Sequence, residues 1–262
     1  MTRQPLLGLA TTLGLALAFG TVGGERSAHA QAYGTIKGRL VWGGAKLPAD
    51  TPLVKKGDSA VKDAAVCSAD AVPNEDYVVD PATKGVANGF AYVLTPKGTN
   101  PAAEKALLAK EPEVVVDQKG CRFLPHVVAI HKDQKVNFKS EDAVGHNVRY
   151  TAFANGGMNV MVAPNGSLIK EFKAPEKNPT EIRCDIHPWM NGYFMVFDHP
   201  FYAITKADGS FEITGVPAGT QRVIVRQEKA GFVTKGARQG VEVEVKAGGT
   251  TDLGDIVLTP KG

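Results

Sequence analysis

In "EIRCDIHPWMNGYFMVF", residues 181–197, two strand-like runs flank a tight loop. Three potential metal ligands, Cys184, His187 and Met190, recur at every third position through that loop. Short runs of β-branched and aromatic residues that end at turn residues are typical of strands. We therefore expect a strand, then a loop that holds a thiol, an imidazole and a thioether, and then a second strand.

Short strands of this kind are expected along most of the chain. Apolar and polar residues alternate clearly in "VEVEV", residues 241–245, and Gly, Pro, Asn and Asp separate the successive runs. One helix is expected in "NPAAEKALLAK", residues 100–110, where Asn100 can cap the first turn and Pro101 fits inside it. Many short strands with turn residues between them predict a mostly β chain, folded as sandwiches or barrels.

The first thirty residues differ in composition from the rest. Arg3 precedes an apolar run at residues 6–19, and "SAHA", residues 27–30, ends in the small-x-small pattern of a cleavage site. The apolar run is too short to cross a bilayer, so residues 1–30 are predicted to be a signal peptide that is cleaved after Ala30. A periplasmic or secreted protein without a stable membrane anchor is expected; an uncleaved anchor is the alternative.

Charge and cysteine count narrow the classes of function. The formal net charge is +3, and basic and acidic residues are scattered, which argues against nucleic-acid binding. The oxidising compartment of an exported protein favours disulfides, but the chain has an odd number of cysteines, three. One thiol therefore needs another role, and Cys184 is the candidate.

A fourth potential ligand, His146, begins the run "HNVRYTAF" about forty residues before the loop. Two imidazoles, one thiolate and a weak axial thioether describe a mononuclear blue-copper electron-transfer site. Structural zinc more usually recruits further Cys or His, non-haem iron a carboxylate, and binuclear copper a second thiolate. The donors therefore favour one copper ion, although a chance match of the motif is still an alternative.

The spacing Cys184-x-x-His187-x-x-Met190, preceded by "His-Asn-Val" at His146, resembles the cupredoxins. The loop is most similar to that of the amicyanins and differs in spacing from that of the plastocyanins. The resemblance implies a Greek-key β-barrel with His146, Cys184 and His187 as equatorial copper ligands and Met190 as the axial ligand. It also implies that Asn147 ties the two ligand-bearing segments together.

A second resemblance involves segments on both sides of this region. "GTIKGRLVWGG" (residues 34–44), "GFAYVL" (89–94) and "TKADGSFEITGVPAGTQRVIV" (205–225) resemble the carboxypeptidase regulatory-like module, a transthyretin-like β-sandwich. The resemblance implies no peptidase activity, since the segments contain turn and strand residues and no catalytic set.

The two resemblances predict a split domain. After the signal peptide, residues 33–112 would form the first part of the sandwich together with a loop and a short helix. Residues 113–198 would form the inserted copper domain, and residues 199–262 would complete the sandwich. Two tandem domains that meet near Asp198 are the alternative.

The other two cysteines, Cys67 and Cys121, are expected to form a disulfide, with two separate buried thiols as the alternative. The sequence separation of 54 residues would give a stabilisation on the order of 4 kcal/mol. His131, in a polar turn, is expected to be solvated. His126 is expected to be an ordinary residue or to approach the metal site.

The predicted activity is the transfer of single electrons by Cu(II)/Cu(I) between redox partners, such as a c-type cytochrome or a periplasmic dehydrogenase. His187 is expected to lie nearest the surface, with Pro188 and Trp189 in an apolar docking patch. Core packing is the alternative role for Trp189.

Two other classes are alternatives: a periplasmic Cu(I) carrier or storage protein, and a structural or adhesion β-sandwich without metal. A copper oxidase or nitrite reductase would need a second site with several more histidines. Only five of the six histidines follow the predicted signal peptide. The sequence therefore predicts that the chain is not an enzyme.

Overall fold

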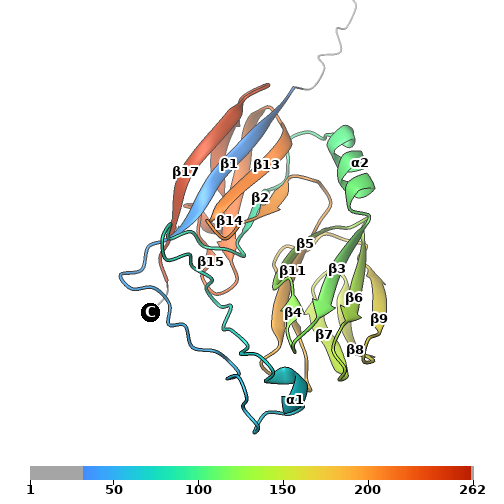
Figure 1. The fold of residues 1–262 in the computed structure, drawn as a ribbon. Coiled ribbons are helices and arrows are strands. Elements are labelled where there is room, and N and C mark those ends of the chain that lie inside the picture. Colours follow the sequence, from blue (N-terminus) through green and yellow to red (C-terminus); the bar gives the residue numbers. More distant parts are fainter. Residues whose placement is uncertain (1–31, 261–262) are drawn as a thin grey trace, which may run out of the picture. The chain divides into compact units, whose positions relative to one another are not determined.

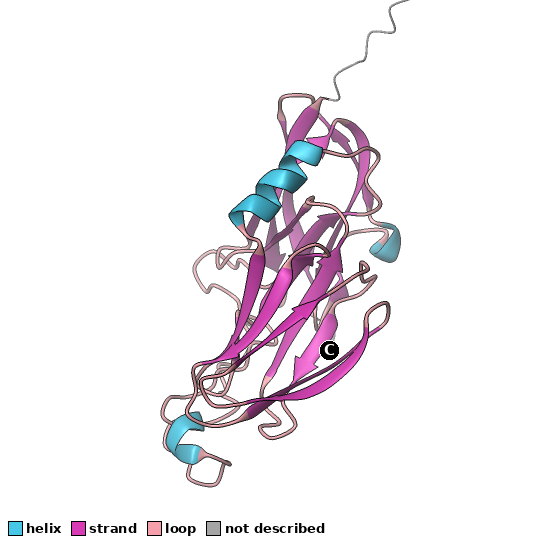
Figure 2. Cartoon of the chain, turned by 90° about the vertical axis from the view of Figure 1, so that its right-hand side faces the viewer, coloured by secondary structure: helices cyan, strands magenta, loops and turns pink. Residues whose placement is uncertain are grey.

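Strands account for most of the regular structure in residues 32–260, the part of the chain that the computed structural model describes. The prediction of a mostly β chain is confirmed. Helical segments lie at the outside of the strands (Figure 2): α1 (Ala64–Cys67), α2 (Pro101–Lys110) and the 3-10 helix η1 (Ala237–Gln239). Across these residues no helix combines the length and apolar composition needed to cross a membrane. The predicted signal peptide, residues 1–30, lies outside the described residues.

Residues 113–197 form two sheets, which we call the inner half. One sheet has the strand order β5-β11-β10-β7-β8 and the other β4-β3-β6-β9. The strands are β3 (Glu113–Gln118), β4 (Phe123–Leu124), β5 (Val127–His131), β6 (Lys135–Ser140), β7 (His146–Ala152), β8 (Gly156–Val162), β9 (Ser167–Glu171), β10 (Thr180–Arg183) and β11 (Asn191–Phe197).

The strands before and after this region share two further sheets, which we call the flanking half. The orders are β13-β1-β17 and β12-β2-β14-β15, with β16 also paired to β14. Figure 1 shows β1, from the start of the described chain, between β13 and β17 from its end. The strands are β1 (Tyr33–Trp42), β2 (Phe90–Val93), β12 (Tyr202–Ile204), β13 (Ser210–Pro217), β14 (Gly219–Gln227), β15 (Gly231–Phe232), β16 (Val241–Val245) and β17 (Thr250–Leu258).

Local sequence patterns account for individual elements. In β16, Val243 and Val245 are buried while the glutamates beside them are exposed, because successive side chains of a strand point to opposite faces. Helix α2 begins as predicted: the Asn100 side chain accepts a hydrogen bond from the Ala103 amide, and Pro101 occupies the first turn.

Each half has its own apolar core, and a third cluster joins them. Within that cluster the rings of Tyr92 and Phe197, one from each half, lie 5.3 Å apart. Both halves belong to one compact unit of the chain. The shared cluster contains Phe90, Tyr92 and Ile224 from the flanking half and Val127, Met195 and Phe197 from the inner half.

A long connection between β1 and β2 leaves the flanking half. Figure 1 shows it running to α1, beside the β4 end of the inner half, and returning to β2. Its outer part closes on itself at the isolated bridge between Val54 and Val72, both of which are buried. We call residues 54–72 the cap segment. It brings α1 against the inner core, where Val66 and Cys67 pack.

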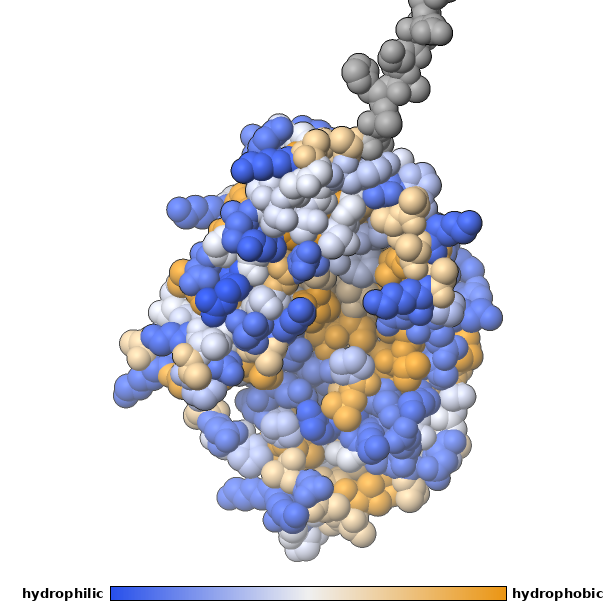
Figure 3. Space-filling model, turned by 45° about the horizontal axis from the view of Figure 1, so that its top comes forward, coloured by the Kyte–Doolittle hydropathy of each residue, from blue (hydrophilic) through white to orange (hydrophobic). Residues whose placement is uncertain are grey.

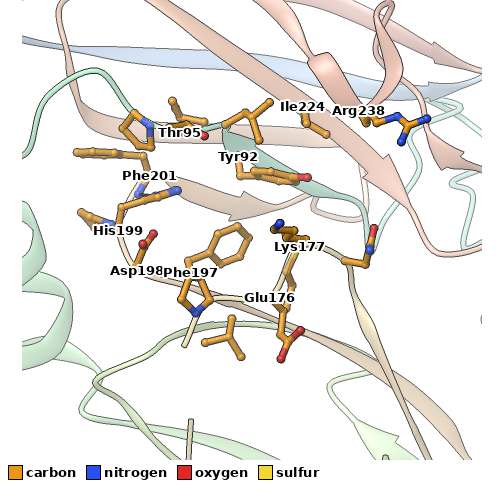
Figure 4. A pocket seen from close by; sticks show the side chains of 18 of the residues that line it. Tyr92, Thr95, Glu176, Lys177, Phe197, Asp198, His199, Phe201, Ile224 and Arg238 are labelled. Atoms are coloured by element: carbon orange, nitrogen blue, oxygen red, sulfur yellow. Dashed lines mark hydrogen bonds between the residues drawn. The ribbon is translucent and has the colours of Figure 1, made fainter. Parts of the chain in front are cut away.

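Hydrophilic residues cover most of the face in Figure 3, and apolar residues gather in a hollow near its middle. A cleft of about 950 Å³ lies between the halves. Tyr92 and Ile224 of the flanking half and Phe197 of the inner half line it, with Lys177 and Arg238 among its charged residues (Figure 4). Met195, Val196 and Phe197 at the end of β11 also line the cleft, so it lies at the end of that strand away from Asn191.

Candidate metal centre

A hairpin of β10 and β11 holds the loop that contains Cys184. The strands pair antiparallel, with Arg183 opposite Asn191, so the loop occupies residues 184–190. The Cys184 amide donates to the Met190 carbonyl at 3.2 Å, and the Met190 amide donates to the His187 carbonyl at 2.9 Å. These bonds close the loop on itself, as the strand–loop–strand prediction requires.

His146 reaches this loop from the first position of β7, because β7 lies beside β10 in the sheet. Its Nδ1 lies 2.9 Å from Nδ1 of His187, which in turn lies 3.8 Å from Sγ of Cys184. All three side chains are almost completely buried, and so is Met190. The structure therefore brings the four predicted ligand residues to one end of the inner half, with three donor atoms converging.

A carboxylate holds the outer nitrogen of each imidazole. Nε2 of His146 lies 2.8 Å from Oδ2 of Asp142, and Nε2 of His187 lies 2.9 Å from Oδ2 of Asp63. Asp142 also accepts backbone hydrogen bonds from Gly120 and Cys121. Because the carboxylates occupy both Nε2 atoms, both Nδ1 atoms face inward, and this fixes the ring orientation needed of a metal ligand.

The electrostatics of the site favour a thiolate. Burial raises the pKa of the Cys184 thiol, but hydrogen bonding to His146 and His187 outweighs burial and lowers that pKa to about 6. Burial lowers the pKa of His146, but hydrogen bonding to Asp142 and Cys184 outweighs it and raises that pKa to about 9. These hydrogen bonds thus favour the deprotonated sulfur that binds metal ions.

Asn147 connects the His146 strand to the Cys184 loop. Its Oδ1 accepts a hydrogen bond of 2.6 Å from the Asp185 amide. Its Nδ2 donates to Oδ1 of Asn159 and Oδ2 of Asp185, at 2.7 and 3.1 Å. The contacts agree with the tie between segments that the cupredoxin resemblance implies.

The disulfide expected between Cys67 and Cys121 is present. The two sulfur atoms and a ring nitrogen of His187 lie within 4.8 Å of one another. The bond therefore attaches the cap segment directly beside the candidate metal centre.

The structure corrects the expectation that His187 lies nearest the surface. Its side chain is completely buried, because Asp63 of the cap segment covers its outer nitrogen. Pro188 is exposed, whereas Trp189 is partly buried and donates its indole N–H to the Cys121 carbonyl at 3.2 Å. No pattern in the loop could indicate this cover, since Asp63 lies more than one hundred positions earlier.

The other histidines that the structure describes lie outside the cluster of His146, Cys184 and His187. The expectation of a solvated His131 is wrong: the side chain is completely buried, with Nε2 at 3.3 Å from Oε1 of Glu104. His126 is buried with Nε2 at 2.9 Å from Oε1 of Glu228 and belongs to no candidate metal group among the described residues. Sequence reasoning missed Asp63 and Asp142. Asp142 lies four positions before His146, but this spacing has no distinctive meaning outside a helix.

The donor set fits a copper ion. Two imidazole nitrogens and one thiolate converge, a thioether residue is buried beside them, and the group of donor atoms that His146, Cys184 and His187 form contains no carboxylate oxygen. Imidazole suits Cu(II), while thiolate and thioether favour Cu(I). His146, Cys184, His187 and Met190 are the residues that could hold it.

Comparisons with known proteins give partial similarities to copper proteins. No protein-family model matches the chain, and no curated protein sequence does. Among solved structures, a copper-containing nitrite reductase from Thermus scotoductus SA-01 is 22% identical, with a TM-score of 0.30. That match covers 32% of this chain and 22% of the reductase, so this chain spans about a fifth of the reductase's length.

Two amicyanin structures are similar over more of their own length. A mutant amicyanin in its reduced Cu(I) form at pH 4 is 21% identical, with a TM-score of 0.30, over 33% of this chain and 84% of that one. Amicyanin from Paracoccus versutus is 21% identical, with a TM-score of 0.28, over 41% of this chain and 97% of that one. None of these matches supports the transthyretin-like resemblance of the flanking half.

The nitrite reductase match contradicts the prediction that the chain is not an enzyme. A copper enzyme is among the structures to which part of this fold is similar. The count of remaining histidines was an argument against one kind of second copper site only, and it does not exclude catalysis.

Proposed function

We propose that the inner half binds one copper ion and transfers single electrons. His146, Cys184 and His187 would be the equatorial ligands and Met190 the axial ligand. The observation that carries the proposal is the convergence of two Nδ1 atoms and one Sγ atom in a buried site. Such a donor set describes a blue-copper site.

The chain's own residues supply the rigidity that electron transfer needs. The β10–β11 hairpin holds the loop, and Asn147 joins it to β7. Asp142 and Asp63 keep the two imidazole rings from turning, and burial excludes water. A bound copper ion would supply the one-electron Cu(II)/Cu(I) couple. Because its ligands are already held, little rearrangement would accompany each electron.

The setting of this activity is also a proposal. We infer an exported protein, periplasmic or secreted, that exchanges electrons with a c-type cytochrome or a periplasmic dehydrogenase. We also infer the domain division at residues 33–112, 113–198 and 199–262. Its support is that strands on both sides of the inner half share the same sheets.

A Cu(I) carrier is the second candidate. The cap segment that closes His187 from solvent favours it, since a carrier must hold Cu(I) away from competing ligands. The two candidates differ in colour: a blue site has an intense thiolate-to-Cu(II) absorption, whereas a Cu(I) carrier has none.

The deciding experiment adds Cu(II) to the purified protein and records its visible absorption. We expect an intense thiolate-to-copper band that is lost in Cys184→Ala and kept in His199→Ala, since His199 lies outside the cluster. A colourless protein that binds Cu(I) would instead favour the carrier. Failure to bind copper in either oxidation state would contradict both candidates.

A further inference from the structure

The cap segment places one carboxylate between the candidate ligand His187 and solvent. The His187 side chain is completely buried, while the side chain of Asp63 is one-third exposed. Oδ2 of Asp63 lies 2.9 Å from Nε2 of His187. Asp63 is therefore the group that separates this imidazole from water on its outer side.

Asp63 is not held there by its own helix. It occupies the N-cap position of α1, where an aspartate usually accepts a hydrogen bond from the first turn, yet its side chain makes no capping bond. Its backbone has φ 55° and ψ 39°, the left-handed region that most residues avoid. The carboxylate gives up its usual local partner and points to an imidazole 124 positions away.

Covalent and apolar contacts anchor the segment that carries Asp63. Cys67 forms the disulfide with Cys121, and the backbone N–H of Cys121 also donates a hydrogen bond to Asp142 at the metal end. Val66 packs against the inner core. These contacts fix α1 over the site independently of the hydrogen bond to His187.

We propose that Asp63 is a positioning residue for His187 and that the disulfide-anchored cap segment closes the metal site to solvent and small molecules. The first part concerns the metal-free protein. The second part rests on the proposed copper site. Asp63 holds the ring with Nδ1 turned toward Cys184, and the cap segment makes the entry and loss of a metal ion slow.

Two substitutions at position 63 separate the effect of the Asp63 side chain from that of its backbone conformation. Asp63→Gly removes the carboxylate at a position whose positive φ glycine adopts without strain. Asp63→Asn keeps an oxygen that accepts from Nε2–H. Asp70→Ala is the matched control, since Asp70 lies in the same segment and forms only an exposed pair with Lys56.

The first test labels metal-free protein with diethyl pyrocarbonate and follows the peptide that contains His187 by mass spectrometry. We expect labelling at least about tenfold faster in Asp63→Gly than in the natural protein, because the side chain that covers Nε2 of His187 and accepts its hydrogen bond is removed. Asp63→Asn and Asp70→Ala should label at the natural rate. Unchanged labelling of His187 in Asp63→Gly would overturn the proposal.

The second test loads the protein with copper and measures its capture by an excess of a strong chelator. Capture should be faster by about tenfold or more in Asp63→Gly and in the double variant Cys67→Ser/Cys121→Ser, compared with Asp70→Ala. Equal rates in all variants would overturn the closing role of the cap segment. If no variant binds copper, the proposed function fails, and the labelling experiment still decides the role of Asp63.

Discussion

The two halves of the described chain bury polar groups in different ways. In the flanking half, the buried side chains of Gln221 and Thr205 bond to the backbone: Gln221 donates to the Pro217 carbonyl, and Thr205 donates to the Val86 carbonyl. Its core otherwise consists of aliphatic and aromatic side chains. In the inner half, buried polar side chains at one end are polar partners of one another, as His146 and His187 are.

This difference indicates where chemistry can occur. A side chain that bonds to the backbone is part of the fold, and losing that bond would leave a buried backbone group without a partner and destabilise the segment. A cluster of side chains that are partners of one another can exchange those partners for a metal ion without loss of backbone hydrogen bonds. The cost of burying polar groups is then offset in both states, with or without the ion.

The largest effect is expected when one buried phenylalanine is truncated in the core of either half. Phe194→Ala in the inner half and Phe211→Ala in the flanking half should each reduce the free energy of unfolding by about 3–5 kcal/mol, since both rings are buried. Only Phe194→Ala should also weaken copper binding, because Phe194 belongs to the strand that follows the ligand loop. Urea unfolding and the visible absorption measure the two effects.

The two phenylalanine variants also test whether the halves are coupled. Were Phe211→Ala to abolish the copper absorption under conditions where the protein is folded, the polar cluster would depend on the flanking core. The chemistry of the inner half would then not be a property of that half alone.

A smaller effect is expected when a side chain of the buried polar cluster in the inner half is removed. Asp142→Ala should lower copper affinity about 10- to 100-fold, because His146 loses the carboxylate that orients its ring. Asp133→Ala is the control, since Asp133 lies beside the buried His131, away from the cluster. Competition with a chelator of known affinity measures both. Equal losses in the two variants would show that the effect is not specific to the site.

The smallest expected effect concerns a buried pair that joins the halves, His126 and Glu228. Burial lowers the pKa of His126, but its carboxylate neighbours Glu228 and Glu75 outweigh burial and raise it above 6.5. Burial raises the pKa of Glu228 above 4.5. In both cases the folded state holds its proton more tightly than the unfolded state does. The stabilisation is therefore present at low pH and is lost as pH rises, for His126 above about pH 6.5.

Urea unfolding at pH 6 and pH 8.5 checks this sign. Between the two pH values the midpoint of Glu228→Gln should shift less toward lower stability than that of the natural protein, because His126 loses its main charged partner in the variant. The same shift of the midpoint with pH in the two proteins, or a larger loss of stability in Glu228→Gln, would contradict the predicted sign.

Much of the candidate site could be predicted from short stretches of sequence. The hairpin loop from Cys184 to Met190, the mostly β fold and the cap of helix α2 all depend on neighbours within a few positions. What could not be predicted involves contacts between distant segments. The burial of His131 depends on Glu104 of α2, and that of His126 on Glu228 of the turn after β14.

By itself, then, the sequence determined which donor types stand together in the loop, because residues at every third position on a tight hairpin loop must lie near one another. The tertiary structure alone decided how that loop meets the rest of the chain. It placed Asp142 and Asp63 on the outer nitrogens of the two imidazoles and closed His187 under the cap segment. Local backbone geometry follows from a few adjacent residues, whereas the cover over His187 depends on how a connection between two strands of the other half packs across the molecule.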